Sequence, residues 1–402
     1  MTFSRRSRLV AWGTAVLLGW LPAHAAAQEF RSRGGVEFEW RAFPGRSLNP
    51  GQTGQDVSVV FTGEFSLGWN RRDHLLTFEP YGRVDHADGR RTHFDFRTLA
   101  YERAWRDVEL RAGLRRVFWG VTESRHLVDI VNQTDLVENP DGEDKLGQPM
   151  INVAWFSRAG TIDLFLLTGF RQPTFPGTDG RLRAPLVVDP DRAVFEDGGL
   201  TRHLGWAVRW SQTLGGWDIG VSHFNALARD PRLEPAIENG VDGTLVPYYD
   251  RIHQTGLDLQ LTSGGWLWKF EGITRTGGPT GRESAMVGGV EYTIPQIFST
   301  SADLGLLAEV LLDSRDTEPL QNDIFVGGRL ALNDVRSTEL LAGAIVDRQS
   351  GAMLLNLEAS RRLSGSWSVR IEARGFAKAP TADPLYTLRR DDYLSLSLTR
   401  WF

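Results

Sequence analysis

Apolar and polar residues alternate with a period of two along most of the chain. In the segment 203–210, Leu, Trp, Val and Trp alternate with His, Gly, Ala and Arg, and the segments 367–374 and 394–399 alternate in the same way. This period predicts β-strands whose two faces meet different surroundings. Roughly eighteen such segments of about 10–14 residues fit between Gly34 and Phe402. Strands of soluble proteins are usually shorter, whereas a tilted strand that crosses a bilayer needs about 9–11 residues.

The connections between these segments alternate in length. The longest are expected at Gly120–Gly147, Gln172–Gly199 and Arg229–Tyr248. Short turns on one side and long loops on the other are typical of a transmembrane β-barrel. A soluble β-sandwich offers no reason for this segregation, and no fixed-period repeat favours a propeller. The short turns are expected after Trp69, Trp105, Trp155, Ser211, Thr262, Ile294, Leu332 and Arg362.

The first 27 residues predict a signal peptide. Three arginines, at positions 5, 6 and 8, precede an apolar run from Leu9 to Leu21, which is too short to span a bilayer comfortably. Pro22 ends the run, and small residues up to Ala27 offer a cleavage site. An uncleaved anchor is the alternative. We therefore expect an exported protein with a signal peptide at 1–27 and a single barrel domain at 28–402.

Composition removes several classes of protein. The 402 residues include no cysteine, so disulfide frameworks, zinc fingers and thiol nucleophiles are excluded. With 24% charged residues the chain is not a bundle of transmembrane helices. Its net charge of −5 makes nucleic acid a poor partner.

Tryptophan positions support the barrel independently. Indoles favour the interface between membrane and water, because they combine an apolar ring with one N–H donor. Nine of the 14 tryptophans lie beside the expected short turns or the C-terminus, which predicts one interfacial girdle. They are Trp69, Trp105, Trp155, Trp210, Trp217, Trp266, Trp268, Trp367 and Trp401.

The chain ends in YLSLSLTRWF, in which Leu394, Leu396, Leu398 and Phe402 share one face. This ending resembles the terminal strand of bacterial outer-membrane barrels. The resemblance implies that the barrel-assembly machinery recognises Phe402. Arg400 on the same face departs from the pattern, and we expect it at the level of the lipid headgroups.

A second resemblance covers about 27 residues, LRAGLRRVFWGVTESRHLVDIVNQTDL, from Leu110 to Leu136. An Arg-x-Gly strand followed by Trp119-Gly120 and a polar loop is similar to a segment of porin-like outer-membrane channel families. It implies a passive channel and brings no substrate and no functional residues.

If the apolar positions face lipid, the alternate positions face the interior of the barrel, and many of these are charged. Strands one to five and strands sixteen and seventeen are neighbours once the barrel closes. Their arginines are therefore expected to line one wall. The connection 120–147 carries the opposite sign and is expected to fold inward. Arginines facing an acidic loop would form a constriction that selects solutes by size and charge. The alternative, not exclusive, is that these groups form salt-bridge ladders that brace the barrel. The predicted wall comprises Arg83, Arg97, Arg111, Arg115, Arg370 and Arg374, and the predicted constriction loop comprises Glu123, Asp129, Asp135 and Glu138.

Enzymatic chemistry finds little support in the sequence. No histidine has metal-ligand spacing, and Gly-x-Ser-x-Gly does not occur. Glu123, Ser124 and His126 combine the right residue types, but sequence neighbours do not make a triad, and we expect polar loop contacts there. The turn 139–145 lacks calcium-loop spacing. We expect no catalytic residues, no cofactor and no metal.

The sequence as a whole predicts an outer-membrane, all-β antiparallel barrel of about 18 strands, with 16 or 14 as alternatives. Its expected function is passive diffusion of small hydrophilic solutes or ions through a charged lumen. The alternatives are a non-conducting structural or adhesin-type barrel and an outer-membrane hydrolase. The expected partners are outer-membrane lipids, lipopolysaccharide, the barrel-assembly machinery and small solutes. A homo-oligomer is left open.

Overall fold

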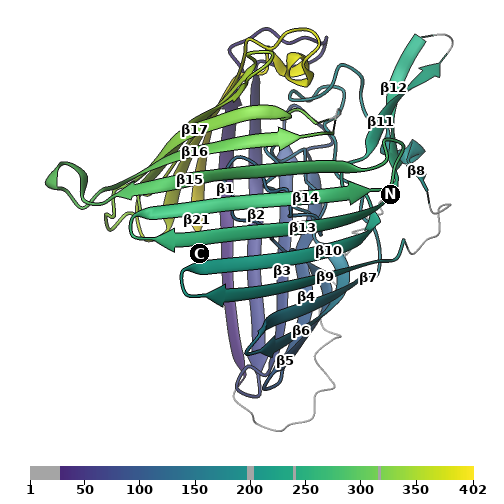
Figure 1. Ribbon diagram of the computed structural model, residues 1–402. Helices are drawn as coiled ribbons and strands as arrows, with labels where there is room; N and C mark the ends of the chain where they lie inside the picture. Colours follow the sequence, from purple (N-terminus) through teal and green to yellow (C-terminus); the bar gives the residue numbers. More distant parts are fainter. Residues whose placement is uncertain (1–27, 197–202, 239–240, 316–317) are drawn as a thin grey trace, which may run out of the picture.

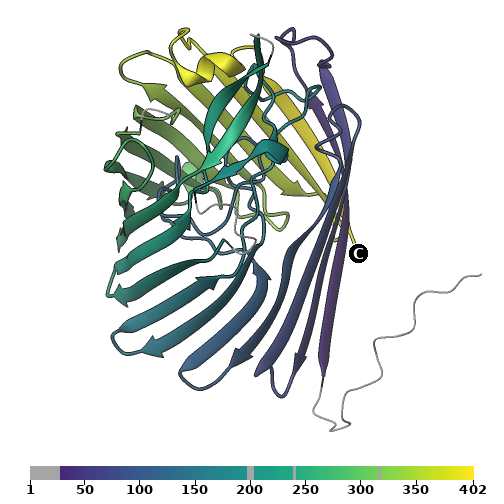
Figure 2. The same cartoon turned by 90° about the vertical axis from the view of Figure 1, so that its right-hand side faces the viewer.

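A computed structural model describes residues 28–196, 203–238, 241–315 and 318–402, so the predicted signal peptide at 1–27 lies outside the described residues. Within these ranges, eighteen strands form one closed antiparallel sheet (Figure 1 and Figure 2). The predicted eighteen-stranded barrel is confirmed. Its strands are β1(Glu29–Ala42), β2(Gln55–Trp69), β3(His74–Asp85), β4(His93–Ala104), β5(Val108–Arg115), β6(Gln148–Ser157), β7(Gly160–Leu167), β9(Gly205–Leu214), β10(Trp217–Leu227), β13(Arg251–Ser263), β14(Trp266–Thr276), β15(Glu283–Ile294), β16(Asp303–Asp313), β17(Asn322–Ala331), β18(Glu339–Asp347), β19(Met353–Arg362), β20(Trp367–Ala377) and β21(Tyr393–Trp401).

The barrel closes between its first and last strands. β21 pairs with β1 from Gly35↔Trp401 to Ala42↔Leu394. One further pair of backbone hydrogen bonds joins Gly34 and Phe402, at 2.9 and 3.0 Å. The last residue therefore takes part in closure. Closure leaves the barrel sheet without an unpaired edge, which a sheet that spans lipid requires.

Connections on one side of the barrel are short, and they occur where the sequence predicts turns. The other side carries the three longest connections, 116–147, 168–204 and 228–250, together with shorter ones. The short side comprises the connections 70–73, 105–107, 158–159, 215–216, 264–265, 295–302, 332–338 and 363–366.

The three long connections differ from the expected loops. The first begins at 116 because β5 ends at Arg115. The second carries a short 3-10 helix, η1(Pro190–Arg192), and β8(Val194–Phe195). The third is mostly a hairpin, since β11(Arg232–Glu238) pairs with β12(Val241–Tyr249), and β12 also pairs with β8. This small sheet stands at the rim (Figure 1). Two more 3-10 helices are η2(Ile297–Ser299) and η3(Pro384–Leu388).

Among the residues that the structure describes, no helix is long and apolar enough to cross a membrane.

The two faces of the strands follow the predicted alternation. In β21 the leucines 394, 396 and 398 are exposed on the outside, while Ser395, Ser397 and Thr399 are buried inside. Arg400 is exposed on the outer face, and its guanidinium lies 5.5 Å from the ring of Trp367. The nine tryptophans that the sequence places beside short turns or the C-terminus lie at the short-turn side. Trp401 is an exception to the girdle, because it points inward, where its Nε1 donates to Ser368.

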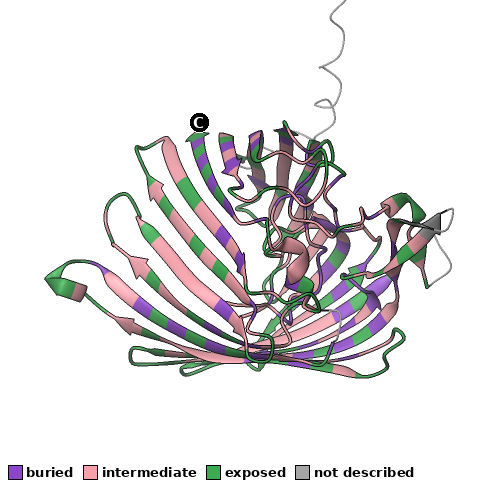
Figure 3. Ribbon diagram, turned by 90° about the horizontal axis from the view of Figure 1, so that it is seen from above, coloured by how far each residue is buried: buried purple, intermediate pink, exposed green. Residues whose placement is uncertain are grey.

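The largest apolar core lies inside the barrel. Inward side chains of β7 to β18, such as Phe165, Phe224 and Val287, pack against Val128 and Val131 of the connection 116–147. The sequence predicted a largely charged interior. Part of the wall is apolar instead, because the connection 116–147 packs against the inner face of β7 to β18. Figure 3 shows irregular segments of the protein inside the ring of strands.

Candidate functional site

The candidate site is the connection between β5 and β6, residues 116–147, which we call the lumen segment. It leaves the wall after Arg115 and returns at Gln148, and these two residues are paired neighbours in the sheet. Between these points the chain contacts β3, β4 and β20 on one side, and β13, β14 and β16 on the other. The lumen segment is thus held by opposite arcs of the barrel.

An apolar face attaches the lumen segment to the arc from β7 to β18. Val128 and Val131 are fully buried, and Trp119, Leu127 and Ile130 are nearly so. The indole of Trp119 meets the ring of Phe165 edge-on at 5.6 Å. Burying a side chain of this size contributes roughly 1.5–3 kcal/mol. The apolar residues that the sequence places in this loop therefore anchor it.

Glu271 of β14 provides a polar anchor in the same region. Its carboxylate accepts hydrogen bonds from the backbone N–H groups of Val121 at 2.7 Å, Thr122 at 3.0 Å and Val128 at 3.1 Å, and from the Thr122 hydroxyl at 2.7 Å. The residue is completely buried. A buried carboxylate needs such donors, and hydrogen bonds to an ionised group are the strong ones. Glu271 therefore fixes the path of two turns of the lumen segment.

Glu309 of β16 repeats this arrangement one strand pair further along. It accepts from the backbone N–H groups of Glu123 and Ser124, both at 2.8 Å, and from the Ser124 hydroxyl at 2.5 Å. Arg125 then donates to Asp313 and to Glu318. The alternation of β14 and β16 places Glu271 and Glu309 on the inner face, but it carries no signal that both receive backbone donors. That role depends on the path of a distant loop.

His126 lies between two carboxylates, with Nε2 at 3.3 Å from Glu143 and Nδ1 at 3.7 Å from Glu271. Burial disfavours the charged imidazole, but the two neighbouring glutamate carboxylates outweigh it and raise the pKa of His126 to about 10. The Ser124 hydroxyl donates to Glu309. The combination of Glu123, Ser124 and His126 is therefore made of separate polar contacts, as expected for a loop.

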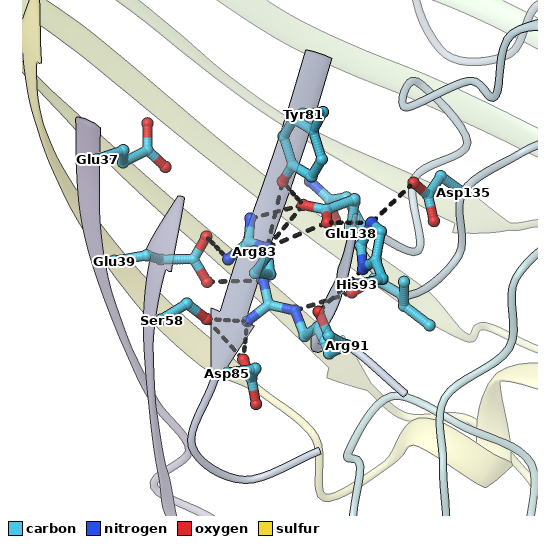
Figure 4. A network of polar contacts seen from close by, with 12 residues as sticks. Glu37, Glu39, Ser58, Tyr81, Arg83, Asp85, Arg91, His93, Asp135 and Glu138 are labelled. Carbon is cyan, nitrogen blue, oxygen red and sulfur yellow. Dashed lines mark hydrogen bonds and ion pairs between the residues drawn. The ribbon is translucent and has the colours of Figure 1, made fainter. Parts of the chain in front are cut away.

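Arginines of β3, β4 and β20 meet acids of the lumen segment on the opposite side, and Figure 4 shows this for Arg83 and Glu138. Arg83 Nη2 lies 2.6 Å from Glu138, and Tyr81 also donates to Glu138 at 2.6 Å. Arg97 lies 2.5 Å from Asp135. On β20, Arg374 lies 2.8 Å from Asp141. Three of the six predicted wall arginines therefore face acids of the lumen segment.

A second layer of charge holds this wall. Arg91, from the connection between β3 and β4, is buried and donates to Glu39 at 2.8 Å and Asp85 at 2.8 Å. It also donates to the carbonyl of Val137 at 2.8 Å. Arg83 shares Glu39 with Arg91, at 3.2 Å. Both predicted roles, constriction and bracing, are therefore compatible with these contacts, and Arg91 was missed because it lies outside any strand pattern.

The other predicted residues lie elsewhere. Arg111 pairs with Glu102 and Glu109 of its own wall, and Arg115 donates to Asn152. Arg370 is exposed inside the barrel. Of the predicted loop acids, Glu123 crosses to the opposite wall, where Arg329 lies at 2.6 Å. Asp129 turns back to Lys145 of the lumen segment itself, at 3.5 Å.

His93, Asp135 and Glu138 form a group whose ligand atoms lie within 4.8 Å of one another. His93 Nε2 is 3.4 Å from Glu138 and 3.8 Å from Asp135. Both carboxylates already receive guanidinium donors, from Arg83 and Arg97. A divalent ion would have to compete with these two cations, so the group fits a network of arginine–carboxylate ion pairs better than a metal site.

The described part of the second long connection, 168–196, contacts both the lumen segment and the region next to β21. The Thr174 hydroxyl donates to Asp135, and Arg181 reaches Asp391 at 2.6 Å next to β21. Arg229 is buried between the rings of Phe170 and Phe224 and donates to the carbonyl of Ile130 at 3.2 Å. Burial lowers the pKa of Arg229 to about 9. Both of the other long connections therefore pack against the lumen segment.

No model of a known protein family matches the chain, and no curated protein matches it. Solved structures do. A triple mutant of the porin of Rhodopseudomonas blastica is 10% identical, with a TM-score of 0.44, over 93% of this chain and 100% of that chain. A double mutant of the same porin is 9% identical, with the same TM-score and coverage. The chain is similar to these porins, and its own closed strand pairing confirms the porin-like barrel fold that the sequence predicts.

Proposed function

We propose that this protein is an outer-membrane channel through which small hydrophilic solutes or ions diffuse passively. The observation that supports this most is the lumen segment. It divides the barrel into an arc closed by apolar packing and an arc lined by charged side chains. Arg370 and the acidic side chains of Glu143 and Asp144 are exposed on the charged side. Hydrated charges of both signs suit the passage of small polar solutes.

The cellular placement belongs to the same proposal. The signal peptide at 1–27 would direct export, and the assembly machinery would recognise Phe402, which is 74% exposed. The beginning of β1 and the end of β21 lie at the short-turn side, which would face the periplasm. Lipopolysaccharide would surround the long-loop side. A homo-oligomer is compatible with this arrangement.

One observation favours a second candidate, a non-conducting barrel with a structural or adhesive role. The lumen segment is bonded to both arcs, by Glu271 and Glu309 on one side and by Arg83 and Arg97 on the other. A segment held so firmly would close the lumen rather than narrow it. A hydrolase finds less support, since Ser124 and His126 are engaged with different glutamates.

Planar-bilayer conductance of the refolded mature chain in a salt gradient tests the proposal. We expect stepwise currents, with a reversal potential set by the charges at the lumen segment. A folded barrel that inserts and stays silent would contradict the channel proposal.

A shortened variant separates the two candidates. Because Arg115 and Gln148 are paired neighbours, a four-residue turn can replace residues 117–146 without opening the wall. If only this variant conducts, the lumen segment is a plug and the non-conducting candidate is right. The matched control replaces residues 233–247 of the rim hairpin, whose flanking residues Arg232 and Tyr248 are also paired, and should behave as the full chain.

A further inference from the structure

The outer face of three neighbouring strands carries polar side chains for several positions below the long-loop ends, where many other strands are apolar. Gln254 and Ile252 of β13 are buried inside, so His253 and Thr255 point outward. The same alternation turns His223 and Asn225 of β10 and Thr274 of β14 outward. We define the outer polar patch as these five residues with Arg251 of β13 and Arg282 of the connection 277–282.

The patch is continuous across the strands. The sheet register pairs His223 with Thr255 and Asn225 with His253, and it pairs Thr255 with Thr274. His223 Nδ1 lies 2.9 Å from the Thr255 hydroxyl, and the two imidazole centres are 6.3 Å apart. These groups are therefore arranged as one surface, near the long-loop ends of the strands.

On several other strands the outward positions near the long-loop end are apolar. These strands present Val84, Phe94, Leu166, Ile324, Leu355 and Leu394, all exposed. On β2 the apolar outward run continues through seven positions, from Val57 to Trp69, whereas on β13 it contains three, Leu257, Leu259 and Leu261. Polar groups on a lipid-facing surface are costly unless a partner satisfies them. The patch therefore needs a partner that is polar at this depth.

The charge of the patch indicates what that partner carries. Arg251 donates to the Asn225 amide oxygen at 2.8 Å and to the carbonyl of Leu204 at 2.9 Å, and this turns the amide nitrogen toward His253 Nδ1, at 3.0 Å. Arg282 donates to Thr274 at 3.4 Å. Within the described part of the chain, no carboxylate lies within ion-pair distance of either guanidinium.

Acidic side chains are confined to the rim above the patch. Outward positions of β10, β13 and β14, all of which are described, contain neither Asp nor Glu. At the rim, Glu196 accepts the backbone N–H of Arg251, and Asp250 faces Arg232. Two guanidinium groups and two imidazoles thus share a surface with neutral hydrogen-bonding groups, which suits a phosphorylated sugar.

An apolar groove lies further along the outer face of β10, β13 and β14, toward their short-turn ends, and includes β15. It has a volume of about 320 Å³ and is lined on the outer face by Trp217, Leu259, Trp268, Phe270 and Val290. Leu259 follows Thr255 by four residues on β13, which corresponds to about 13 Å along a strand. A polar head and an apolar tail therefore find matching surfaces at a spacing suited to one amphiphile.

We propose that the outer polar patch and this groove form a binding site for a phosphorylated glycolipid of the outer leaflet. Arg251, Arg282 and the imidazoles bind the phosphate, Asn225 and the threonine hydroxyls bind the sugar, and the groove holds an acyl chain. The proposal rests on the outer-membrane placement proposed above. It is independent of conduction.

Native mass spectrometry of the refolded full-length mature barrel in detergent tests the site. The probes are a bis-phosphorylated glucosamine-disaccharide lipid, its dephosphorylated form and phosphatidylglycerol. We expect the first to bind at least tenfold more tightly than the other two. R251Q/R282Q should lose most of this binding, and H253L should weaken it several-fold while keeping the heat-modifiable mobility of a folded barrel. The matched control R103Q/R400Q removes two outward arginines at the opposite rim and should bind as the parent does.

Three outcomes would overturn the proposal. They are equal binding of all three lipids, unchanged binding by R251Q/R282Q, and a parent oligomer that the same variant dissociates in the absence of lipid. The last would make the patch an interface between copies. Because the assay measures no current, a silent barrel that binds the glycolipid would contradict only the channel proposal.

Discussion

At the scale of single residues, carboxylates inside the barrel act in two different ways. Glu271 and Glu309 receive backbone N–H groups and fix the course of the lumen segment. Glu138 and Asp135 receive guanidinium groups of the wall. The first kind sets where the chain runs, and the second kind sets which wall it faces.

Replacing Glu271 by alanine should loosen the lumen segment near residues 121–128. Hydrogen bonds to a charged acceptor contribute about 1.5–3 kcal/mol, so amide exchange there should accelerate about 10- to 100-fold. Hydrogen-exchange mass spectrometry measures this effect. Glu339→Ala is the control, because Glu339 is exposed at the short-turn end of β18. Equal exchange in the parent and in Glu271→Ala would show that apolar packing alone holds the segment.

Asp144 should make ion selectivity depend on pH. Its side chain is exposed to the interior of the barrel, and the surrounding protein still partly desolvates it. Burial, followed by the negative charges of Glu138 and Asp141, raises the pKa of Asp144 to about 7. The carboxylate is therefore charged at pH 8 and largely neutral at pH 6, and in the folded chain the neutral form is favoured as the pH falls.

Reversal potentials in a salt gradient at pH 8 and pH 6 measure this selectivity. We expect cation preference to decrease toward pH 6 in the parent chain. Asp144→Asn should show the low-pH value at both pH values. The same pH response in this variant would assign the titration to another group.

At the scale of elements, each strand presents one face to the outside and one to the interior, and the connections decide what the inner face meets. On the inner face of β3, Arg83 meets Glu138 of the lumen segment with both side chains 5% exposed. On the inner face of β5, Arg111 meets only its own neighbours. Arginines on the inner faces of two strands that are separated only by β4 thus have different partners.

Removing one partner of the Arg83–Glu138 pair should cost more than removing both. R83Q leaves a buried carboxylate without its main partner, which costs about 3–5 kcal/mol, whereas R83Q/E138Q leaves two neutral groups. Urea unfolding in lipid vesicles measures these free energies. The exposed pair Arg31–Glu29 serves as the control, and its removal should leave the free energy of unfolding nearly unchanged because solvent screens the pair. Additive effects at Arg83 and Glu138 would mean that the pair is not coupled.

At the scale of the whole molecule, the barrel has a lipid face and a lumen face on every strand, and they should tolerate charge differently. Leu357 and Ser360 lie on opposite faces of β19, and both are exposed. L357R should cost about 2–4 kcal/mol, as for arginine near the bilayer midplane. S360R, which points into the lumen, should cost little. Folding into vesicles, followed by heat-modifiable gel mobility, distinguishes the two, and equal losses would contradict the assigned faces.

Sequence alone determined the architecture because strand alternation is a local property. The period of two, the turn positions and the terminal strand predict eighteen strands, two connection sides and the outward leucines of β21. The inward position of Arg83 and Arg97 follows from the same parity. The inward folding of the connection 120–147 is inferred from its mixed composition, and its residues Val128 and Val131 belong to the buried cluster with side chains of the barrel wall.

Tertiary structure decided what the inner residues meet. Parity places Arg83, Arg111 and Arg370 on one face but does not say which lies opposite an acid, because that depends on the path of the lumen segment. Likewise, parity cannot show that Val128 and Val131 complete an apolar core with side chains of β7 to β18. Nor can it show that Glu271 receives backbone donors from about 150 residues earlier in the chain. These contacts join positions far apart in sequence, and only closure of the barrel around the lumen segment brings them together.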